Sequence, residues 1–340
     1  MLVSVCIPTY NGEAYLNACL QSVCQQTYTD FEILICDDCS IDNTTGIIKT
    51  FQKKDSRIRL IINEKNLGLV GNWNRCMELA KGEWIKFVFQ DDIILPTCLE
   101  SMLKASNSNT QMIVCEREYI FEENVSADIK NLYSKLLRLY QLIGGEGIKY
   151  VSVQHLAELI RRYFPSNFIG EPTSIMLKKA IVNKVGAFNP KITQLCDIEY
   201  CLRVGVNGGF AYVPDKLVKF RIHEKSTTQK NNSEKYFASV FGDRIQIIYL
   251  LLYDFLYIDF RKYCSRVDLL KLKYSLLYVL YNAESYIKKE EKNTTLLKEM
   301  QELNERCPKL KKIRRYYSLY ATLKFLVYFT RLKTDIKNQN

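Results

Sequence analysis

The chain has 340 residues, of which 47% are hydrophobic and 25% charged, a balance typical of a folded globular protein and not of a disordered one. This length is enough for one large domain or two ordinary ones with a sizeable core. Of the net charge of +11, residues 261–340 carry 19 Lys and Arg against 8 Asp and Glu, and residues 1–260 carry 29 of each sign. The neutral main body argues against a nucleic-acid groove, and the basic end favours an anionic surface beside it.

Targeting signals and cysteine spacing limit where the protein works. The N-terminal sequence MLVSVCIPTYNG lacks a basic segment and is interrupted by a proline, so we expect no signal peptide. No apolar run reaches the roughly 18 residues that a membrane-spanning helix needs. Cys36 and Cys39 have a CxxC spacing without a second pair nearby, which argues against zinc. The twelve scattered cysteines predict reduced thiols and a cytoplasmic protein.

Short apolar strands alternate with helices over the first hundred residues. The pattern predicts strands at residues 3–7, 31–36 and 58–62 and a fourth beginning at 84, separated by helices over 15–23, up to about 54, and over 72–80. Such alternation predicts βαβ units and a parallel sheet with helices on both faces.

Polar clusters follow three of these four strands. They are PTYNG at 8–12, DDCSID at 37–42 and QDD at 90–92. Right-handed crossovers bring the carboxyl ends of parallel strands to one edge of a sheet, so the clusters should meet in space. Each cluster alone could be a solvated turn, but three at one edge favour a ligand site.

The last cluster contains two adjacent carboxylates, Asp91 and Asp92. Two such groups repel each other unless a proton or a cation lies between them, and a hard divalent cation carrying a diphosphate suits the position. The chain has neither GxGxxG after the first strand nor GxxxxGK[ST], which disfavours a dinucleotide site and a phosphate-loop NTPase. A metal at Asp91 and Asp92 would neutralise phosphates instead.

Together with the segment NLGLVGNWNRCMELAKGEWIKFVFQDD, the three clusters resemble the nucleotide-sugar-binding half of an inverting family 2 glycosyltransferase with the GT-A fold. The similarity covers residues 3–105 and resumes over 170–228. It implies an α/β fold with a Rossmann-like, mostly parallel sheet and helices on both faces. The expected domains are a catalytic domain (1–230), made of a nucleotide-sugar half (1–105) and an acceptor half (106–230), and a basic C-terminal helical region (231–340).

The resemblance also implies roles for residues of the nucleotide-sugar half. The first cluster would line the base pocket through Pro8, Thr9, Tyr10 and Asn11. Asp38 would hydrogen-bond the pyrimidine, and Asp42 and Asn72 would frame the ribose and phosphate side. Asp92 would ligate Mn²⁺ or Mg²⁺, with Asp91 beside it at the ribose and sugar. The family pattern is often DxD, and Gln90 stands at its first position, which leaves a metal role for Gln90 open.

Residues 106–169 give the weakest pattern. A strand is expected over 112–115 and helical periodicity over 132–143, which the pair Gly144-Gly145 ends. The segment either shapes the acceptor side or forms a surface helical hairpin.

Beyond residue 170, the sequence predicts a strand over 174–177, a turn at 186–188 and a helix that begins near Asp197 and Glu199. A carboxylate there can be a helix cap. The segment also resembles the family's GxF…(E/D)D…R pattern, which implies that Asp197 is the general base for the acceptor hydroxyl. Glu199 is its rival or orients the acceptor, and Cys196 replaces the first carboxylate of the usual pair.

Two closing strands are expected over 210–213 and 217–222, directly before His223. A lone histidine is often structural, but this one resembles the family's RxH…S element, which implies a ligand of the metal or the diphosphate. His155 has no such context and is expected to be structural.

From about residue 233 the sequence changes to long helices rich in Tyr, Leu and Lys, and KLKKIRR leads into YYSLYATLKFLVYFTRLK. Apolar and aromatic residues flanked by Lys and Arg suit a helix in the headgroup region of an anionic membrane. The alternative is a helix packed on the catalytic domain with a solvated basic face. The membrane interpretation predicts a peripheral protein on the inner face of the membrane.

The expected function is a metal-dependent, inverting transfer of a hexosyl or N-acetylhexosaminyl group. The donor would be a UDP-sugar or another nucleotide sugar, and the acceptor a glycan or lipid-linked glycan of a bacterial surface polysaccharide such as capsule or lipopolysaccharide. One alternative is a nucleotidyltransferase, which would prefer a glycine-rich, basic first loop that PTYNGEAYL lacks. The other is a catalytically lapsed, membrane-associated sugar-nucleotide binder, which Gln90 and Cys196 support.

Overall fold

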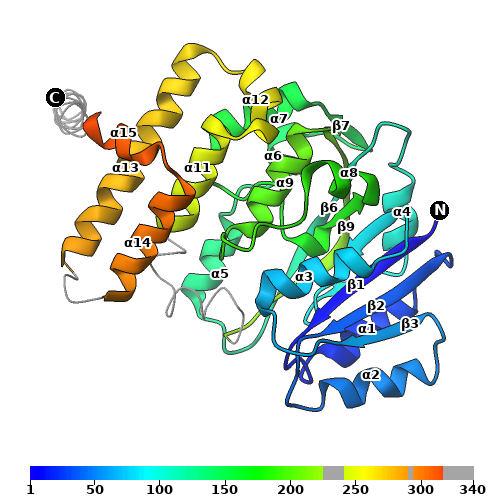
Figure 1. Cartoon of the computed structure of the whole chain (residues 1–340). Helices are drawn as coiled ribbons and strands as arrows, with labels where there is room; N and C mark the ends of the chain where they lie inside the picture. The colour runs from blue at the N-terminus through cyan, green and yellow to red at the C-terminus, as the bar shows by residue number, and fades with distance from the viewer. Residues whose placement is uncertain (225–240, 290–293, 317–340) are drawn as a thin grey trace. The chain divides into compact units, whose positions relative to one another are not determined.

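The computed structural model describes residues 1–224, 241–289 and 294–316 (Figure 1). The chain divides into two compact units, Met1–Lys230 and Asn231–Asn340.

The first unit is built on a mixed sheet with the strand order β3-β2-β1-β4-β8-β6-β9-β5, and β7 pairs with β9. The strands are β1 (Val3–Thr9), β2 (Phe31–Asp37), β3 (Ile58–Ile62), β4 (Trp84–Phe87), β5 (Ile93–Ile94), β6 (Met112–Phe121), β7 (Lys149–Val151), β8 (Ile175–Lys178) and β9 (Phe210–Ile222). The first four strands are mutually parallel, and β8 joins β4 to β6 in antiparallel pairing. The expected α/β fold with a Rossmann-like parallel core is confirmed.

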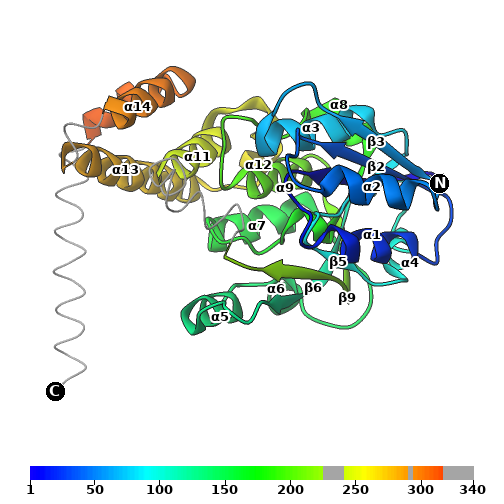
Figure 2. The same cartoon turned by 90° about the horizontal axis from the view of Figure 1, so that it is seen from below.

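Helices cover both faces of this sheet. Figure 2 shows β2 and β3 between α3 on one side and α1 and α2 on the other. The helical elements of the unit are α1 (Leu16–Cys24), α2 (Thr44–Gln52), α3 (Gly68–Leu79), α4 (Cys98–Leu103), α5 (Ala127–Ser134), α6 (Leu139–Ile143), α7 (Val153–Tyr163), the 3₁₀ turn η1 (Pro172–Ser174), α8 (Lys179–Val185) and α9 (Cys196–Val206).

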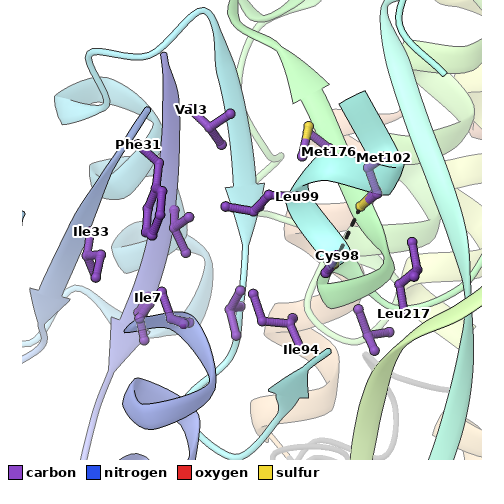
Figure 3. Packing of buried hydrophobic residues seen from close by; sticks show 14 of the residues in the cluster. Val3, Ile7, Phe31, Ile33, Ile94, Cys98, Leu99, Met102, Met176 and Leu217 are labelled. Carbon is purple, nitrogen blue, oxygen red and sulfur yellow. Dashed lines mark hydrogen bonds between the residues drawn. The ribbon is translucent and has the colours of Figure 1, made fainter. Parts of the chain in front are cut away.

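Side chains of β1 alternate between two layers, as the period of two in a strand requires. Val3, Val5 and Ile7 enter the large core beneath α1 and α4, and the Cys6 thiol on the other face donates to the carbonyl of Cys76 in α3. Figure 3 shows part of the first layer, with Phe31, Ile33, Ile94, Cys98, Leu99, Met102, Met176 and Leu217. The strand ends are therefore anchored in a packed core.

Several sequence predictions of element bounds are corrected by the structure. The two closing strands form one strand, β9, whose pairing with β6 shifts register opposite Cys115 and Glu116. The predicted strand at 112–115 extends to Phe121, and the helical pattern over 132–143 divides into α5 and α6. The pairing of β6 with β9 supplies hydrogen bonds that a single-strand pattern does not reveal.

The second unit is helical over its described residues. Its elements are α11 (Asp243–Tyr253), η3 (Phe255–Tyr257), α12 (Ile258–Lys262), α13 (Arg266–Lys289), α14 (Thr294–Arg306), α15 (Leu310–Ile313) and η4 (Arg314–Tyr316). Leu272, Leu276, Leu280, Ala283 and Ile287 form the buried stripe of α13. The expected C-terminal helical extension is confirmed for these residues. Most of YYSLYATLKFLVYFTRLK lies outside them, and no described helix is long and apolar enough to cross a membrane.

Candidate active site

The three polar clusters predicted to converge are joined by hydrogen bonds at the carboxyl edge of the sheet. The Thr9 hydroxyl donates to Asp37 Oδ1 at 2.9 Å, and Asp37 also accepts from Ser40. The Asn11 amide N–H donates to Ser40 Oγ at 2.9 Å, and Asn11 Oδ1 accepts from the backbone N–H of Ile41. The loops after β1 and β2 therefore form one connected surface. Pro8 and Thr9 are buried beneath it, and Tyr10 is 47% exposed.

Gln90 connects this surface to the third cluster. Its Oε1 accepts from the Tyr10 N–H at 2.9 Å, and its Nε2 donates to the Tyr10 carbonyl at 3.1 Å. Gly12 makes this contact possible, because a Cβ at that position would lie 2.2 Å from Gln90 Oε1. Both ends of the Gln90 amide are thus engaged in holding the loop after β1 against the end of β4.

Asp38 is 2% exposed and accepts several hydrogen bonds from the start of α3. Its Oδ1 accepts from Asn63 Nδ2 and from the Leu67 N–H, and its Oδ2 accepts from the Gly68 N–H at 2.9 Å. A carboxylate has about four acceptor positions, and both oxygens of Asp38 accept hydrogen bonds from the chain.

Asn72 and Asp42, two further predicted donor-site residues, have internal partners. Asn72 is 3% exposed, its Nδ2 donates to the Cys36 carbonyl, and its Oδ1 accepts from Asn63. Asp42 accepts from the Glu13 N–H and from the N–H and hydroxyl of Thr44, which links the loop after β1 to the start of α2. These contacts hold the walls of the site together.

Asp92 points into the protein and is fully buried. Its Oδ1 accepts from the Arg221 N–H at 2.9 Å, and its Oδ2 accepts from the hydroxyl of Thr173 in η1. Burial, and secondarily the charge of Asp91, raise the pKa of Asp92 well above its ordinary value. Asp92 thereby ties together β4, β9 and η1.

Asp91 points the other way and meets His223. Asp91 Oδ2 lies 3.0 Å from His223 Nε2, and the Asp91 side chain is 25% exposed. Arg221 donates from Nε to the Asp91 carbonyl at 3.0 Å, and its guanidinium lies 4.9 Å from the centre of the Tyr15 ring. The Tyr15 ring in turn packs 4.8 Å from that of His223. This packing fixes both members of the Asp91–His223 pair.

The chemistry of the Asp91–His223 pair fits a divalent cation. Adjacent ligands of a six-coordinate ion with bonds of about 2.1 Å lie about 3.0 Å apart, which matches the separation of these two atoms. Among the described residues, no three His, Cys, Asp or Glu side chains gather as a metal cluster. The donor set therefore suits an ion that takes its remaining ligands from water and phosphate oxygens, as Mg²⁺ commonly does.

Lys86 is a site residue that the sequence reasoning missed. It is fully buried on β4, and its ammonium donates to the carbonyl of Thr173 and, at 3.2 Å, to that of Phe87. Since Thr173 binds Asp92, Lys86 holds the turn that orients this carboxylate. A lysine within the apolar run WIKFVF is the signal that could have identified it, because fully buried lysines are rare.

The other two predicted acids, Asp197 and Glu199, lie in the first turn of α9. Asp197 is partly exposed, and the Ile198 N–H donates to its Oδ1 at 2.8 Å. Glu199 is 1% exposed and forms two hydrogen bonds with Arg203, at 2.8 and 2.9 Å. Arg203 also donates to the carbonyls of Val185 and Ala187. Of the two acids, Asp197 is the one that solvent reaches.

Replacing Glu199 with glutamine should lower the free energy of unfolding by about 3 kcal/mol, because it leaves the Arg203 charge buried without its partner. Urea denaturation measures the change. Glu158→Gln is a matched control, because Glu158 forms an i,i+4 pair with Arg162 in which both side chains are well exposed. A Glu199→Gln protein that is as stable as wild type would contradict this structural role of the Glu199–Arg203 pair.

His155 lies in the first turn of α7, where its N–H donates to the capping Ser152 hydroxyl at 3.2 Å. His155 therefore lies on a helix and not at the end of a strand, and its structural role stays a prediction.

The parallel core and the acids at its carboxyl edge define the class of protein as an α/β protein of the GT-A type. A model of the family "Glycosyl transferase family 2" matches residues 4–186, more than half of the chain. The chain belongs to this family and is a glycosyltransferase.

Similarity to individual proteins supports this family assignment. The uncharacterized protein MT1568 of Mycobacterium tuberculosis is 30% identical over 228 residues, which cover 66% of this chain and 68% of that protein. The UDP-Glc:alpha-D-GlcNAc-diphosphoundecaprenol beta-1,3-glucosyltransferase WfgD of Escherichia coli is 36% identical over 142 residues, 40% of this chain and 55% of its own length. Staphylococcus aureus TarS 1–349 with UDP-GlcNAc aligns with a TM-score of 0.57 at 17% identity, covering 82% of this chain and 81% of that one, and supports the fold.

Proposed function

We propose that the protein transfers a sugar from a UDP-sugar to a lipid-linked glycan in bacterial surface polysaccharide synthesis, with inversion at the anomeric carbon. The observation that carries the proposal is the convergence of three strand-end clusters on one sheet edge, with the Asp91–His223 pair beside them. WfgD, by its name, uses UDP-Glc and a lipid-linked acceptor, and the TarS structure contains UDP-GlcNAc.

In this proposal, the residues of the first cluster and Asp38 bind the nucleoside. Tyr10 is 47% exposed and would pack its ring on the base, and Asp38 Oδ2, which accepts from the Gly68 N–H, would accept a second hydrogen bond from the N–H of a pyrimidine. Asp42 and Asn72 act through the loops that they hold, on the ribose and phosphate side.

Asp91 and His223 would hold Mn²⁺ or Mg²⁺, which supplies Lewis-acid stabilisation of the charge on the departing diphosphate. The sequence prediction gave the metal to Asp92 and His223. We move the carboxylate role to Asp91, because Asp92 is fully buried with both oxygens accepting hydrogen bonds. Asp92 then orients Arg221 and the chain that bears His223.

Asp197 would accept the proton of the acceptor hydroxyl as its oxygen attacks the anomeric carbon on the face opposite the diphosphate. A carboxylate held at the start of a helix stays ionised, because the backbone N–H groups and helix dipole stabilise its charge. An ionised, partly exposed carboxylate is suited to this general-base step.

Isothermal titration calorimetry with UDP, GDP and ADP tests the nucleotide assignment. We expect UDP to bind most tightly and its affinity to fall when Mn²⁺ is replaced by EDTA. Preferred binding of GDP or ADP would contradict the UDP assignment. Binding without turnover in the presence of lipid-linked acceptors would favour the lapsed binder.

The C-terminal segment is proposed to bind the inner face of the membrane as a peripheral anchor. Lys309, Lys311, Lys312, Arg314 and Arg315 give the described part of this segment its positive charge. Deleting residues 309–340 should move the protein from the membrane fraction to the soluble fraction of a cell lysate. If the truncated protein stayed in the membrane fraction, the anchoring proposal would be wrong.

A further inference from the structure

Exposed apolar side chains concentrate where η3, α12 and the start of α13 follow one another in the second unit. Large apolar side chains of this stretch are between 42% and 74% exposed. They are Phe255, Ile258, Tyr263, Val267 and Leu270. Single exposed apolar residues are common on protein surfaces, but several within so short a stretch form the kind of patch that marks a binding surface. The exposed residues of 255–273 are called the 255–273 face below.

The inner side of the same elements is packed into the second unit. Tyr257 and Phe260 are fully buried, and Leu272 begins the buried stripe of α13. The Arg261 guanidinium donates to the carbonyl of Leu251 in α11 at 3.1 Å. Helix α11 contacts η3, α12 and α13 (Figure 1). The exposed apolar side chains therefore belong to a segment that is anchored from behind.

Helical spacing places the exposed side chains on two adjoining surfaces. Phe255 and Ile258 are three residues apart, as are Val267 and Leu270, and residues at this spacing share one side of a helix. Residues 263–265 connect α12 to α13 and can span at most roughly 14 Å. The two surfaces therefore adjoin, through a connection that is itself largely exposed.

Basic side chains border the exposed apolar ones. Residues 255–273 contain five Lys and Arg against two Asp. The exposed basic residues are Lys262, Arg266, Lys271 and Lys273. Asp259 pairs with Lys262 at 2.7 Å, and Asp268 accepts from the N–H and the hydroxyl of Ser265. Since both acids are engaged within the segment, the 255–273 face presents a positive surplus beside apolar side chains.

The 255–273 face lies next to the start of the proposed C-terminal anchor. Lys309 is the first residue of that anchor, and its ammonium lies 4.2 Å from the centre of the Tyr253 ring, at the end of α11. Tyr253 is two residues before Phe255. A single anionic surface can therefore contact both basic regions.

This combination fits a lipid bilayer better than a protein partner. Apolar and aromatic side chains beside Lys and Arg are typical of segments that lie in the headgroup region, where the cations contact lipid phosphates. Lysine is depleted from protein–protein interfaces, yet three of the five basic residues of 255–273 are lysines.

We propose that the 255–273 face docks on an anionic membrane, with Phe255, Ile258, Val267 and Leu270 entering the headgroup region and the basic side chains contacting lipid phosphates. This surface is additional to residues 309–340 and goes beyond the proposed function, because it needs neither sugar donor nor acceptor. Weak membrane contacts hold a protein stably when two act together, so loss of either contact should release it.

Co-sedimentation of the full chain with lipid vesicles tests the apolar part of the face. Wild type should bind phosphatidylcholine vesicles that contain phosphatidylglycerol more tightly than pure phosphatidylcholine vesicles, and added salt should weaken this binding. Phe255→Gln and Leu270→Gln should each lower the partition coefficient by about 3- to 30-fold, because each removes an apolar side chain from the headgroup region. Leu297→Gln is the matched control, because Leu297 of α14 is 51% exposed and lies outside the face, and it should change partitioning by less than about twofold.

A triple variant tests the basic part. Replacing Lys262, Arg266 and Lys271 with glutamine should lower binding to the anionic vesicles by about 10- to 100-fold, since each basic residue near such a surface contributes about fivefold. The control removes the same charge at the exposed end of α2 in the first unit, from Lys49, Lys53 and Lys54. It should bind like wild type. The Tm of every variant should stay close to that of wild type, because the altered side chains are exposed.

The outcomes separate this proposal from its alternatives. Unchanged partitioning of the apolar and the basic variants would overturn it. Self-association of the wild-type protein that these variants abolish, measured by sedimentation equilibrium, would assign the face to a second copy of the chain and also overturn it. A wild-type protein that turns over no sugar donor yet binds vesicles through the face would overturn the proposed function alone.

Discussion

Asp197→Asn should lower kcat for sugar transfer by about 10²–10⁴, the range typical of losing a general base. The asparagine amide cannot take a proton from the acceptor hydroxyl at neutral pH. Asp197 lies in the first turn of α9 and is partly exposed, so the change should spare the core and the nucleotide side of the site. The affinity for UDP and the Tm should therefore stay close to those of wild type.

Steady-state transfer kinetics with the preferred UDP-sugar, together with calorimetry of UDP binding, separate these two effects. Asp215→Asn is a suitable control, because Asp215 is exposed at the bulge of β9. Its kcat should equal that of wild type. An Asp197→Asn protein with wild-type kcat would contradict the assignment of the base.

Asp91→Asn should raise the Mn²⁺ concentration needed for half-maximal activity by at least about 100-fold, more than a residue outside the metal's direct ligands would cost. The reason is that Asp91 Oδ2 and His223 Nε2, 3.0 Å apart, form the pair proposed to hold the ion. An amide oxygen at this position is neutral and binds a hard cation weakly.

Asp92→Asn provides the contrast within the same site. This variant cannot accept from both the Arg221 N–H and the Thr173 hydroxyl, so it should lower the Tm more than its affinity for Mn²⁺. Activity measured across a Mn²⁺ titration, with Tm measured in parallel, distinguishes the two. If Asp92→Asn loses the metal response while Asp91→Asn keeps it, the metal ligand is Asp92, as the sequence resemblance implied.

The positions of Asp91 and Asp92 could be predicted from the sequence, but the directions of their side chains could not. The meeting of PTYNG, DDCSID and QDD could be predicted, because parallel strands with right-handed crossovers place their carboxyl ends at one edge. The directions of Asp91 and Asp92 could not. β4 ends at Phe87, and beyond it the chain turns, so the alternation of a strand no longer tells which side chain points inward.

Contacts between distant segments explain the other differences. Asn72 lies within an amphipathic helix pattern, yet its partners are the carbonyl of Cys36 and the side chain of Asn63, which no local pattern reveals. Glu199 resembles a possible base until Arg203, one helical turn later, occupies both of its oxygens. The i,i+4 spacing of this pair was visible in the sequence, and its burial was not.

Residues 106–169 were the least predictable part because their elements are short and their strands depend on pairing with distant ones. No residue of α5 is fully buried, and Tyr133 contacts Tyr119 and Phe121 across the chain. Buried Arg117 of β6 forms an ion pair with Glu171 in the loop before η1, and Arg138, which directly precedes α6, forms one with Glu116 of β6. A pattern of single residues along the chain does not bring these segments together.

The most direct test of the central claim is the release of UDP from a panel of UDP-sugars, with Mn²⁺ and a lipid-linked GlcNAc-diphosphate acceptor present. We predict that one UDP-sugar is turned over, that the rate falls when EDTA is added, and that Asp197→Asn binds the same donor without turning it over. Metal-independent release, or turnover of no donor by the wild-type protein across the panel, would contradict the account.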